Sequence, residues 1–346
     1  MADDGIETLV ALSHAFGIAE YVLGGGGNTS CKDEATLWVK PSGTVLGEMT
    51  AESFVALDRA KLAALYALEA PDDPSAREAL VKETAGAAVQ TGSAGRPSVE
   101  APLHDSFDAT FVVHTHPTRV NGLTCAQHGA QACAELFPDA LWVPYTDPGY
   151  TLCMRGRADM ARYADAHGRQ PHVVFLQNHV VFVAASTVDA LRTDYAHILG
   201  TLDRAYAEAG VDAELHPAPL PEPAVWQAVA EALRTACGEA AQGIAPSGRF
   251  PVAEGPLSPD HIVYAKAYPF VGEPTAAALQ AFEAERGYPP RIVSAGVGVF
   301  GVGASQTQAD LALLFAKDGA RVCRLAEAFG GVHVLDKRAS DFIEHW

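Results

Sequence analysis

The chain has 346 residues, of which 49% are hydrophobic and 19% are charged, and its formal net charge is −18 at pH 7. This length suits one large domain or two ordinary ones, and the composition is that of a globular protein. The acidic balance argues against nucleic acid as a partner, because binding it needs clustered Lys and Arg side chains. A small anionic ligand stays possible, since a local pocket can differ in sign from the whole surface.

The sequence carries no targeting pattern that we can identify. Its first residues, Met-Ala-Asp-Asp-Gly, lack the basic-then-apolar pattern of a signal peptide. No apolar run approaches the roughly 20 residues that a membrane-spanning helix needs. The six cysteines are scattered without a C-x-x-C pair, which favours reduced thiols. We therefore expect a cytoplasmic protein that has no membrane partner.

The first predicted helix covers residues 5–23 and leads into a glycine-rich segment at residues 24–30. Four consecutive glycines free the backbone to approach a ligand closely. With Asn28 and Ser30 beside them, the exposed backbone N–H groups would suit an anion. A plain turn is an equally good interpretation of the same residues.

A second polar loop follows a short predicted strand over residues 37–40. Lys40 ends this strand, and Pro41-Ser42-Gly43-Thr44 then forms a turn with two hydroxyl groups and free backbone. The periodicity of the next apolar residues predicts helices over 50–69 and 75–91.

Residues 96–117 hold the strongest chemical pattern of the chain. An apolar run at 111–113 predicts the end of a buried strand, and His114 and His116 follow it. Alternate residues of a strand point the same way, so both imidazoles would project from one face. Glu100 precedes them, either as a solvated loop carboxylate or as a general base whose pKa is raised by burial.

Strands and helices alternate over most of the remaining chain. Helices are predicted at residues 118–126, 158–167, 188–209, 224–237, 274–286 and 306–328, and strands at residues 141–145, 173–176, 180–184, 262–265 and 291–303. His179 follows the predicted strand at 173–176 by three residues. Three imidazoles with an open fourth position are the usual make-up of a catalytic zinc site, so His179 would complete a ligand set with His114 and His116. The other histidines we interpret as non-ligands, with His104 the least secure because it lies four residues after Glu100.

The Pro-rich segment 216–223 marks the predicted domain boundary, with a first domain at 1–215 and a smaller α/β domain at 224–346. Within the second domain, Gly296, Gly298 and Gly301 match the dinucleotide fingerprint G-x-G-x-x-G. Too little chain follows to build the βαβ series of a Rossmann unit. We therefore interpret these glycines as part of a structural strand or turn.

Six motifs together resemble the class II aldolase/adducin family. In the family's order over residues 20–210 they are Gly-Gly-Asn28-Thr-Ser30, Lys40-Pro-Ser42-Gly43, Pro97-Ser98-Val-Glu100, His114-Thr-His116-Pro, Val143-Pro-Tyr145 with Pro148-Gly149, and Asn178-His179. The chain is most similar to the aldolase portion of bifunctional rhamnulose-1-phosphate aldolase/short-chain dehydrogenase proteins. We expect it to lack their dehydrogenase domain.

The resemblance implies a three-layer α/β/α fold with a central, mostly antiparallel sheet, followed by a smaller C-terminal α/β domain. It implies a divalent metal, usually zinc with Mn²⁺ or Co²⁺ as alternatives, on His114, His116 and His179. Glu100 would be the proton-moving carboxylate, and cyclic homotetramers are common in the family. The substrate phosphate would lie against residues of the two loops and of the segment before Glu100: Gly27, Asn28, Lys40, Ser42, Gly43 and Ser98.

The expected reaction is cleavage of a ketose 1-phosphate, such as rhamnulose 1-phosphate, to dihydroxyacetone phosphate and a small aldehyde. It would pass through a metal-stabilised enediolate that Glu100 protonates. The same site would also suit a sugar-phosphate epimerase, a decarboxylase, or an aldolase for a carboxylated or sulfonated sugar; a non-catalytic adducin-like scaffold is a further alternative. Val99 and Gly25 stand where some family members carry additional phosphate donors.

Overall fold

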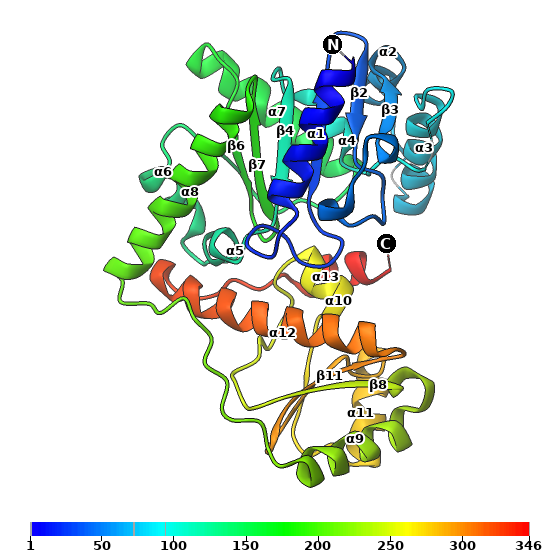
Figure 1. Cartoon of the computed structure of the whole chain (residues 1–346), viewed down its shortest axis with the longest axis vertical. Coiled ribbons are helices and arrows are strands. Elements are labelled where there is room, and N and C mark those ends of the chain that lie inside the picture. The colour runs from blue at the N-terminus through cyan, green and yellow to red at the C-terminus, as the bar shows by residue number, and fades with distance from the viewer. Residues whose placement is uncertain (1, 72, 94, 346) are drawn as a thin grey trace. The chain divides into compact units, whose positions relative to one another are not determined.

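The computed structural model describes residues 2–71, 73–93 and 95–345, and the chain divides into two compact units. Unit 1 comprises residues 1–120 and 130–202, and unit 2 comprises residues 121–129 and 203–346. Each unit has its own sheet (Figure 1). The Pro-rich segment 216–223 falls inside unit 2 by this division, and its role as a linker stays a prediction.

Unit 1 is built on a seven-stranded sheet with the order β3-β2-β1-β4-β7-β6-β5. The strands are β1 (Asn28–Lys32), β2 (Thr36–Val39), β3 (Val55–Asp58), β4 (Phe111–Thr115), β5 (Leu141–Val143), β6 (Val173–Leu176) and β7 (Val180–Ala185). Every neighbouring pair is antiparallel except β5 and β6, which run parallel. The predicted mostly antiparallel sheet is confirmed.

Helices pack on both faces of this sheet (Figure 1). They are α1 (Ala2–Phe16), α2 (Arg59–Leu62), α3 (Pro74–Ala87), α4 (Ala101–Ser106), α6 (Gly129–Leu136) and α7 (Tyr150–His167), while α5 (Thr118–Thr124) and α8 (Val188–Glu208) continue into unit 2. On one face Val112 and Phe182 form a core with Leu103 of α4 and Leu152 of α7. His114 lies two residues after Val112 and pairs with Phe182 across β4 and β7, so it projects toward this same face.

The opposite face carries α1 and α8. The Tyr195 hydroxyl of α8 lies 2.8 Å from the Thr115 hydroxyl of β4, and Ser13 of α1 lies 2.6 Å from the Thr29 hydroxyl of β1. Thr29 pairs with Val113 in the sheet, which places it on the face away from His114. The arrangement is the expected three-layer α/β/α fold, with the histidine on the α4 and α7 side.

Unit 2 holds the second, smaller sheet, with the order β8-β11-β10-β9. Its elements are α9 (Pro223–Cys237), β8 (Gly243–Ser247), α10 (Pro259–Ala265), β9 (Phe270–Val271), α11 (Ala276–Arg286), β10 (Ile292–Ala295), β11 (Gly298–Gly303), α12 (Gln306–Ala326) and α13 (Lys337–Glu344). Leu233 of α9 and Leu279 of α11 pack against Phe300 on one face. The predicted smaller C-terminal α/β region is confirmed.

The glycines of the dinucleotide-like motif lie in a β-hairpin, since the predicted strand at 291–303 is in fact β10 followed by antiparallel β11. A Cβ atom on Gly301 would lie 2.1 Å from the carbonyl oxygen of Ala309 in α12. Gly303 is similarly close to α12, with the Ala309 backbone nitrogen 2.7 Å away. These glycines therefore let a helix backbone pack directly on the strand.

Two predicted elements are wrong. The helix expected over 50–69 is interrupted by β3, which pairs with β2 and buries Val55 and Leu57 on alternate positions. The strand expected over 262–265 is the end of α10, which begins at Pro259 after the N-cap residue Ser258. A short apolar run cannot be assigned by periodicity alone, and here Pro at the first helical position was the stronger signal.

Two helices differ from their predicted limits. The first ends at Phe16 rather than residue 23, and α7 begins at Tyr150 rather than residue 158. Within the described residues, no helix is both long enough and apolar enough to cross a membrane.

Candidate metal centre and anion-binding loops

Three histidines of unit 1 converge where β4 ends and where the chain turns from β6 into β7. His114 is the penultimate residue of β4, His116 follows the strand and donates its backbone N–H to the Tyr21 carbonyl (2.8 Å), and His179 lies in the turn between β6 and β7. The Nε2 atoms of His114 and His116 are 2.8 Å apart. One ligand nitrogen from each of the three histidines lies within 4.8 Å of the others. The fold thus brings together the three histidines that the sequence pattern singled out.

The β6–β7 turn depends on an unusual backbone conformation at Asn178, whose φ is 53°. Asn tolerates this left-handed region better than most residues. The His179 backbone N–H then donates to the Leu176 carbonyl (3.1 Å), which closes the turn. This local geometry holds the third imidazole beside the two from β4.

The protonation state of His114 suits a metal ligand. Its side chain is buried, and desolvation together with the neighbouring His116 and His179 holds the pKa of His114 well below its ordinary value. The imidazole is therefore neutral near pH 7, which is the form that coordinates a metal. Three clustered imidazole nitrogens fit a divalent cation of the zinc type.

Glu100 lies directly before α4 and faces this cluster. Its Oε2 atom is 3.2 Å from His114 Nδ1, and its Oε1 atom is 3.9 Å from His179 Nε2. The side chain is only 16% exposed, so it is not the solvated loop carboxylate of the alternative interpretation. A carboxylate in this position is close enough to exchange a proton with a molecule bound at the three histidines.

His104, which sequence reasoning left as a non-ligand, supports the cluster from behind. It is fully buried, and its ring lies parallel to that of His114 with centroids 6.2 Å apart. Its Nδ1 atom is 2.8 Å from the Ser30 hydroxyl, and burial lowers the pKa of His104 to about 3. It is not a member of the converging group, and its contacts fix the position of α4 on the sheet.

Strand register brings the predicted anion-binding segments beside the histidines. Asn28 of β1 pairs directly with His114 of β4. The β1–β2 ladder continues through the Lys40 N–H to the Thr29 carbonyl, and Pro41 forms a further bridge with Pro97. Neighbouring strands lie about 4.8 Å apart, so the segment at Pro41 is about 10 Å from the His114 backbone. Asn28 thus lies between the histidines and both serine-bearing segments.

Asn28 is a deeply buried polar residue of this region, with 2% of its surface exposed. Its Oδ1 atom has no hydrogen-bond partner within the part of the chain that the structure describes. Buried polar atoms are normally satisfied, so an unpartnered one beside a candidate site is consistent with a missing ligand or water.

Lys40 connects the two loops. Its Nζ atom donates to the Thr44 carbonyl at 2.7 Å and to the Gly25 carbonyl at 3.4 Å, and the side chain is buried. Gly27 has a φ of 73°, and a Cβ atom there would lie 2.4 Å from the Val22 side chain. Gly43 has a φ of 81° but open space around it. Only Gly27 is therefore restricted to glycine by both conformation and room.

The two predicted serines lie on adjoining segments. Ser42 is exposed, and its backbone N–H donates to the Arg96 carbonyl at 2.9 Å. The Ser98 hydroxyl accepts the backbone N–H of Glu100 at 3.2 Å. Arg96, which sequence reasoning did not select, donates from Nη2 to the Ser42 hydroxyl at 3.3 Å. Its place directly before the Pro97-Ser98 motif is the signal that could have found it.

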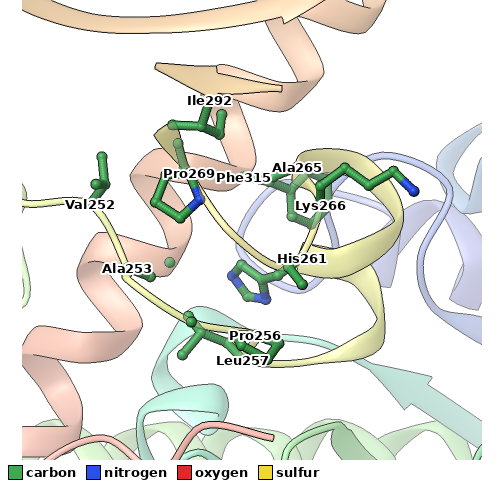
Figure 2. Close-up of a pocket in the computed structure, with 14 residues that line it drawn as sticks. Val252, Ala253, Pro256, Leu257, His261, Ala265, Lys266, Pro269, Ile292 and Phe315 are labelled. Atoms are coloured by element: carbon green, nitrogen blue, oxygen red, sulfur yellow. The ribbon is translucent and has the colours of Figure 1, made fainter. Parts of the chain in front are cut away.

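A recess in unit 2 is also lined by a buried histidine, His261. Figure 2 shows the His261 ring among Ala253, Pro256 and Leu257, with Phe315 and Ile292 on the farther wall. The volume is about 30 Å³, which leaves room for little more than a water molecule. The histidine cluster of unit 1 is therefore the stronger candidate for chemistry.

Comparison with known proteins identifies the family. Residues 7–199 match the model of the class II aldolase and adducin N-terminal domain. The uncharacterized oxidoreductase YuxG of Bacillus subtilis (strain 168) is 30% identical over 186 residues, which are 51% of this chain and 26% of that protein. The chain thus spans about a quarter of the length of this curated relative.

Two solved structures illustrate the likeness. The N-terminal class II aldolase domain of a conserved protein from Thermoplasma acidophilum has a TM-score of 0.50 and 22% identity, and covers 58% of this chain and 93% of that one. An L-fuculose-1-phosphate aldolase from Thermus thermophilus has a TM-score of 0.39 and 13% identity, and covers 60% of this chain and 97% of that one. The matched residues 7–199 contain the whole seven-stranded sheet, Glu100 and the three histidines, and the chain belongs to the class II aldolase/adducin family.

Proposed function

We propose that the protein is a divalent-metal-dependent carbon–carbon lyase that cleaves a ketose 1-phosphate of the rhamnulose-1-phosphate type. The products would be dihydroxyacetone phosphate and a small aldehyde. The observation that carries the proposal is the Glu100 carboxylate, 3.2 Å from His114, facing three histidines that converge within 4.8 Å. Zinc as the metal, a homotetramer and a cytoplasmic location belong to the same proposal and rest on the family resemblance.

The three histidines define what a bound metal would contribute. A divalent cation on His114, His116 and His179 supplies a Lewis acid that withdraws electrons from a bound carbonyl. The burial that keeps His114 neutral also excludes bulk water from this end of β4, which strengthens electrostatic interactions there.

Glu100 would carry the proton transfer. When the C3–C4 bond of the ketose breaks, the C4 hydroxyl gives up its proton as C4 becomes the aldehyde carbon, and C3 retains the electron pair and must receive a proton. Glu100 donates that proton in the cleavage direction and removes it from dihydroxyacetone phosphate in the reverse direction. The backbone contact from Glu100 to Ser98 supports this role, because it ties the carboxylate to the segment that would also hold the phosphate.

Asn28 and the two serine-bearing segments would hold the substrate phosphate. Asn28 pairs with His114 in the sheet, and the Pro41–Pro97 bridge places Ser42 and Ser98 on adjoining segments. A three-carbon phosphate has to reach from the carbonyl site at the histidines to this anion site. The register supports such a span, since only one strand separates the two.

Proton exchange tests the proposal without knowledge of the aldehyde. Purified, zinc-loaded protein would be incubated with dihydroxyacetone phosphate in deuterated water, and deuterium at C3 would be followed by NMR. We expect stereospecific exchange that stops when the metal is removed with a chelator and returns when zinc is restored. No exchange by protein with a full complement of metal would contradict the proposal and favour an epimerase, a decarboxylase or a scaffold.

A further inference from the structure

Arg96 lies at the outer side of the proposed phosphate site. The Pro41–Pro97 bridge places residue 96 beside residue 42, and the two are joined twice. The Ser42 backbone N–H donates to the Arg96 carbonyl at 2.9 Å, and Arg96 Nη2 donates to the Ser42 hydroxyl at 3.3 Å. The backbone of Arg96 is thus fixed by sheet-like pairing, while its side chain is exposed and next to an expected phosphate ligand.

The charge of Arg96 is not balanced by a carboxylate in the way that two other arginines of unit 1 are balanced. Arg59 pairs with Asp105 at 2.6 Å, and Arg169 pairs with Asp139 at 2.8 Å. Among residues 2–71, 73–93 and 95–345, no carboxylate forms an ion pair with Arg96. In a chain with a net charge of −18, a guanidinium whose hydrogen bond among the described residues goes to a hydroxyl suits an anion from outside.

Lys40, the other cation of these loops, contacts the loop backbones. Its buried Nζ atom donates to the carbonyl oxygens of Thr44 and Gly25, so its charge stabilises the loop backbones. Gly25 and Val99 offer no side-chain donor, and Val99 is 42% exposed. Of the two cations of these segments, Arg96 is therefore the one whose side chain contacts a residue of the proposed anion site, Ser42.

We infer that Arg96 binds the substrate phosphate and makes the site selective for a phosphate monoester over the unphosphorylated ketose; this rests on the proposed function. The planar guanidinium offers several N–H donors in a fork that matches two phosphate oxygens, and it is charged at every physiological pH. It would exchange part of its contact with Ser42 for the phosphate, leaving the hydroxyl to donate to the same anion.

Binding measurements on the zinc-loaded full chain test this inference independently of turnover. Calorimetry would give the dissociation constants of dihydroxyacetone phosphate and of dihydroxyacetone for the unchanged protein, Arg96→Ala and Arg96→Lys. Loss of a charge-assisted contact to phosphate predicts a weakening of about tenfold or more for dihydroxyacetone phosphate in Arg96→Ala. Dihydroxyacetone binding should stay unchanged, and Arg96→Lys should lose less, because it keeps the charge without the fork.

Arg169→Ala is the matched control, since Arg169 is also an exposed arginine of unit 1 but pairs with Asp139. It should leave both dissociation constants unchanged. Equal weakening of both ligands in Arg96→Ala, or no weakening of either, would overturn the inference, as would failure of the unchanged protein to bind dihydroxyacetone phosphate. Arg96-dependent binding without proton exchange would leave the inference standing and remove the proposed aldolase reaction instead.

Discussion

Each of the two units contains buried histidine, and the units differ in how the ring nitrogens are used. In unit 2, His261 Nδ1 lies 2.7 Å from the Ser258 hydroxyl and its Nε2 lies 3.1 Å from Asp318. Both nitrogens face fixed protein groups. In unit 1, the Nε2 atoms of His114 and His116 face each other at 2.8 Å, and His179 completes the group.

This difference shows how a structural histidine can be told from a candidate ligand. The His261 imidazole is held by fixed protein groups, through a hydrogen bond at Nδ1 and a close contact with a carboxylate at Nε2. The imidazoles of unit 1 instead turn ring nitrogens toward one another, which is the arrangement that ligands of one shared cation adopt. Burial alone does not distinguish the two sites, because His114 and His261 are both nearly inaccessible.

Of the substitutions that test this difference between the two units, one at Glu100 should have the largest effect. Glu100→Gln preserves shape but removes the proton-accepting carboxylate, so deuterium exchange at C3 of dihydroxyacetone phosphate should fall by about 10²–10⁴-fold. Zinc content, measured by elemental analysis, should not change. Glu34→Gln, at an exposed glutamate of unit 1, is the control. Unaltered exchange in Glu100→Gln would remove the carboxylate from the mechanism.

Metal affinity should separate the two sites directly. His179→Ala removes one of three ligands, so zinc affinity should drop by more than the roughly 10–100-fold typical of losing a group behind a ligand. His261→Ala should keep zinc affinity and instead lower the free energy of unfolding by about 1–3 kcal/mol, because Ser258 and Asp318 lose a buried partner. Competition with a chromogenic chelator and urea denaturation give the two quantities. Full zinc affinity in His179→Ala would place the third ligand elsewhere.

The smallest effects are expected at one glycine in each unit. Gly27→Ala forces a side chain into a left-handed conformation against Val22, and Gly301→Ala forces one against α12. Each should cost about 1–3 kcal/mol of unfolding free energy. Only Gly27→Ala should also weaken binding of dihydroxyacetone phosphate, since Gly27 adjoins Asn28. Weaker binding in Gly301→Ala as well would mean that the loss in Gly27→Ala reflects general destabilisation rather than the loop before Asn28.

Much of the site was predictable because its chemistry lies in short motifs at strand ends. The alternation rule placed His114 and His116 on one side, and the turn after a predicted strand delivered His179. Arg96 was missed because its place before Pro97-Ser98 does not by itself indicate a partner, and its contact with Ser42 exists only once residues 41 and 97 are paired. Long-range pairing is the information that a local pattern lacks.

The lack of long-range information also explains the errors in the predicted elements of the fold. The segment at 50–69 has apolar residues at helical spacing, but pairing with β2 decided in favour of β3. The segment at 262–265 is too short for its period to be read, and the helix α10 that contains it begins with Pro259 at its first position. The sheet order was not derivable from either pattern, since β1 lies between β2 and the distant β4.

The row formed by His114, Asn28, Pro41 and Pro97 has a consequence for how the protein folds. Asn28 pairs with His114, and Pro41 pairs with Pro97. The two partners of each pair are far apart in the sequence, so the contact order of the site is high. Pairings of this kind form slowly, because long loops must close before the contacts stabilise them. The β4–β7 pairing must exist before His114 and His179 are neighbours, so high-affinity zinc uptake during refolding should report the late assembly of the central sheet.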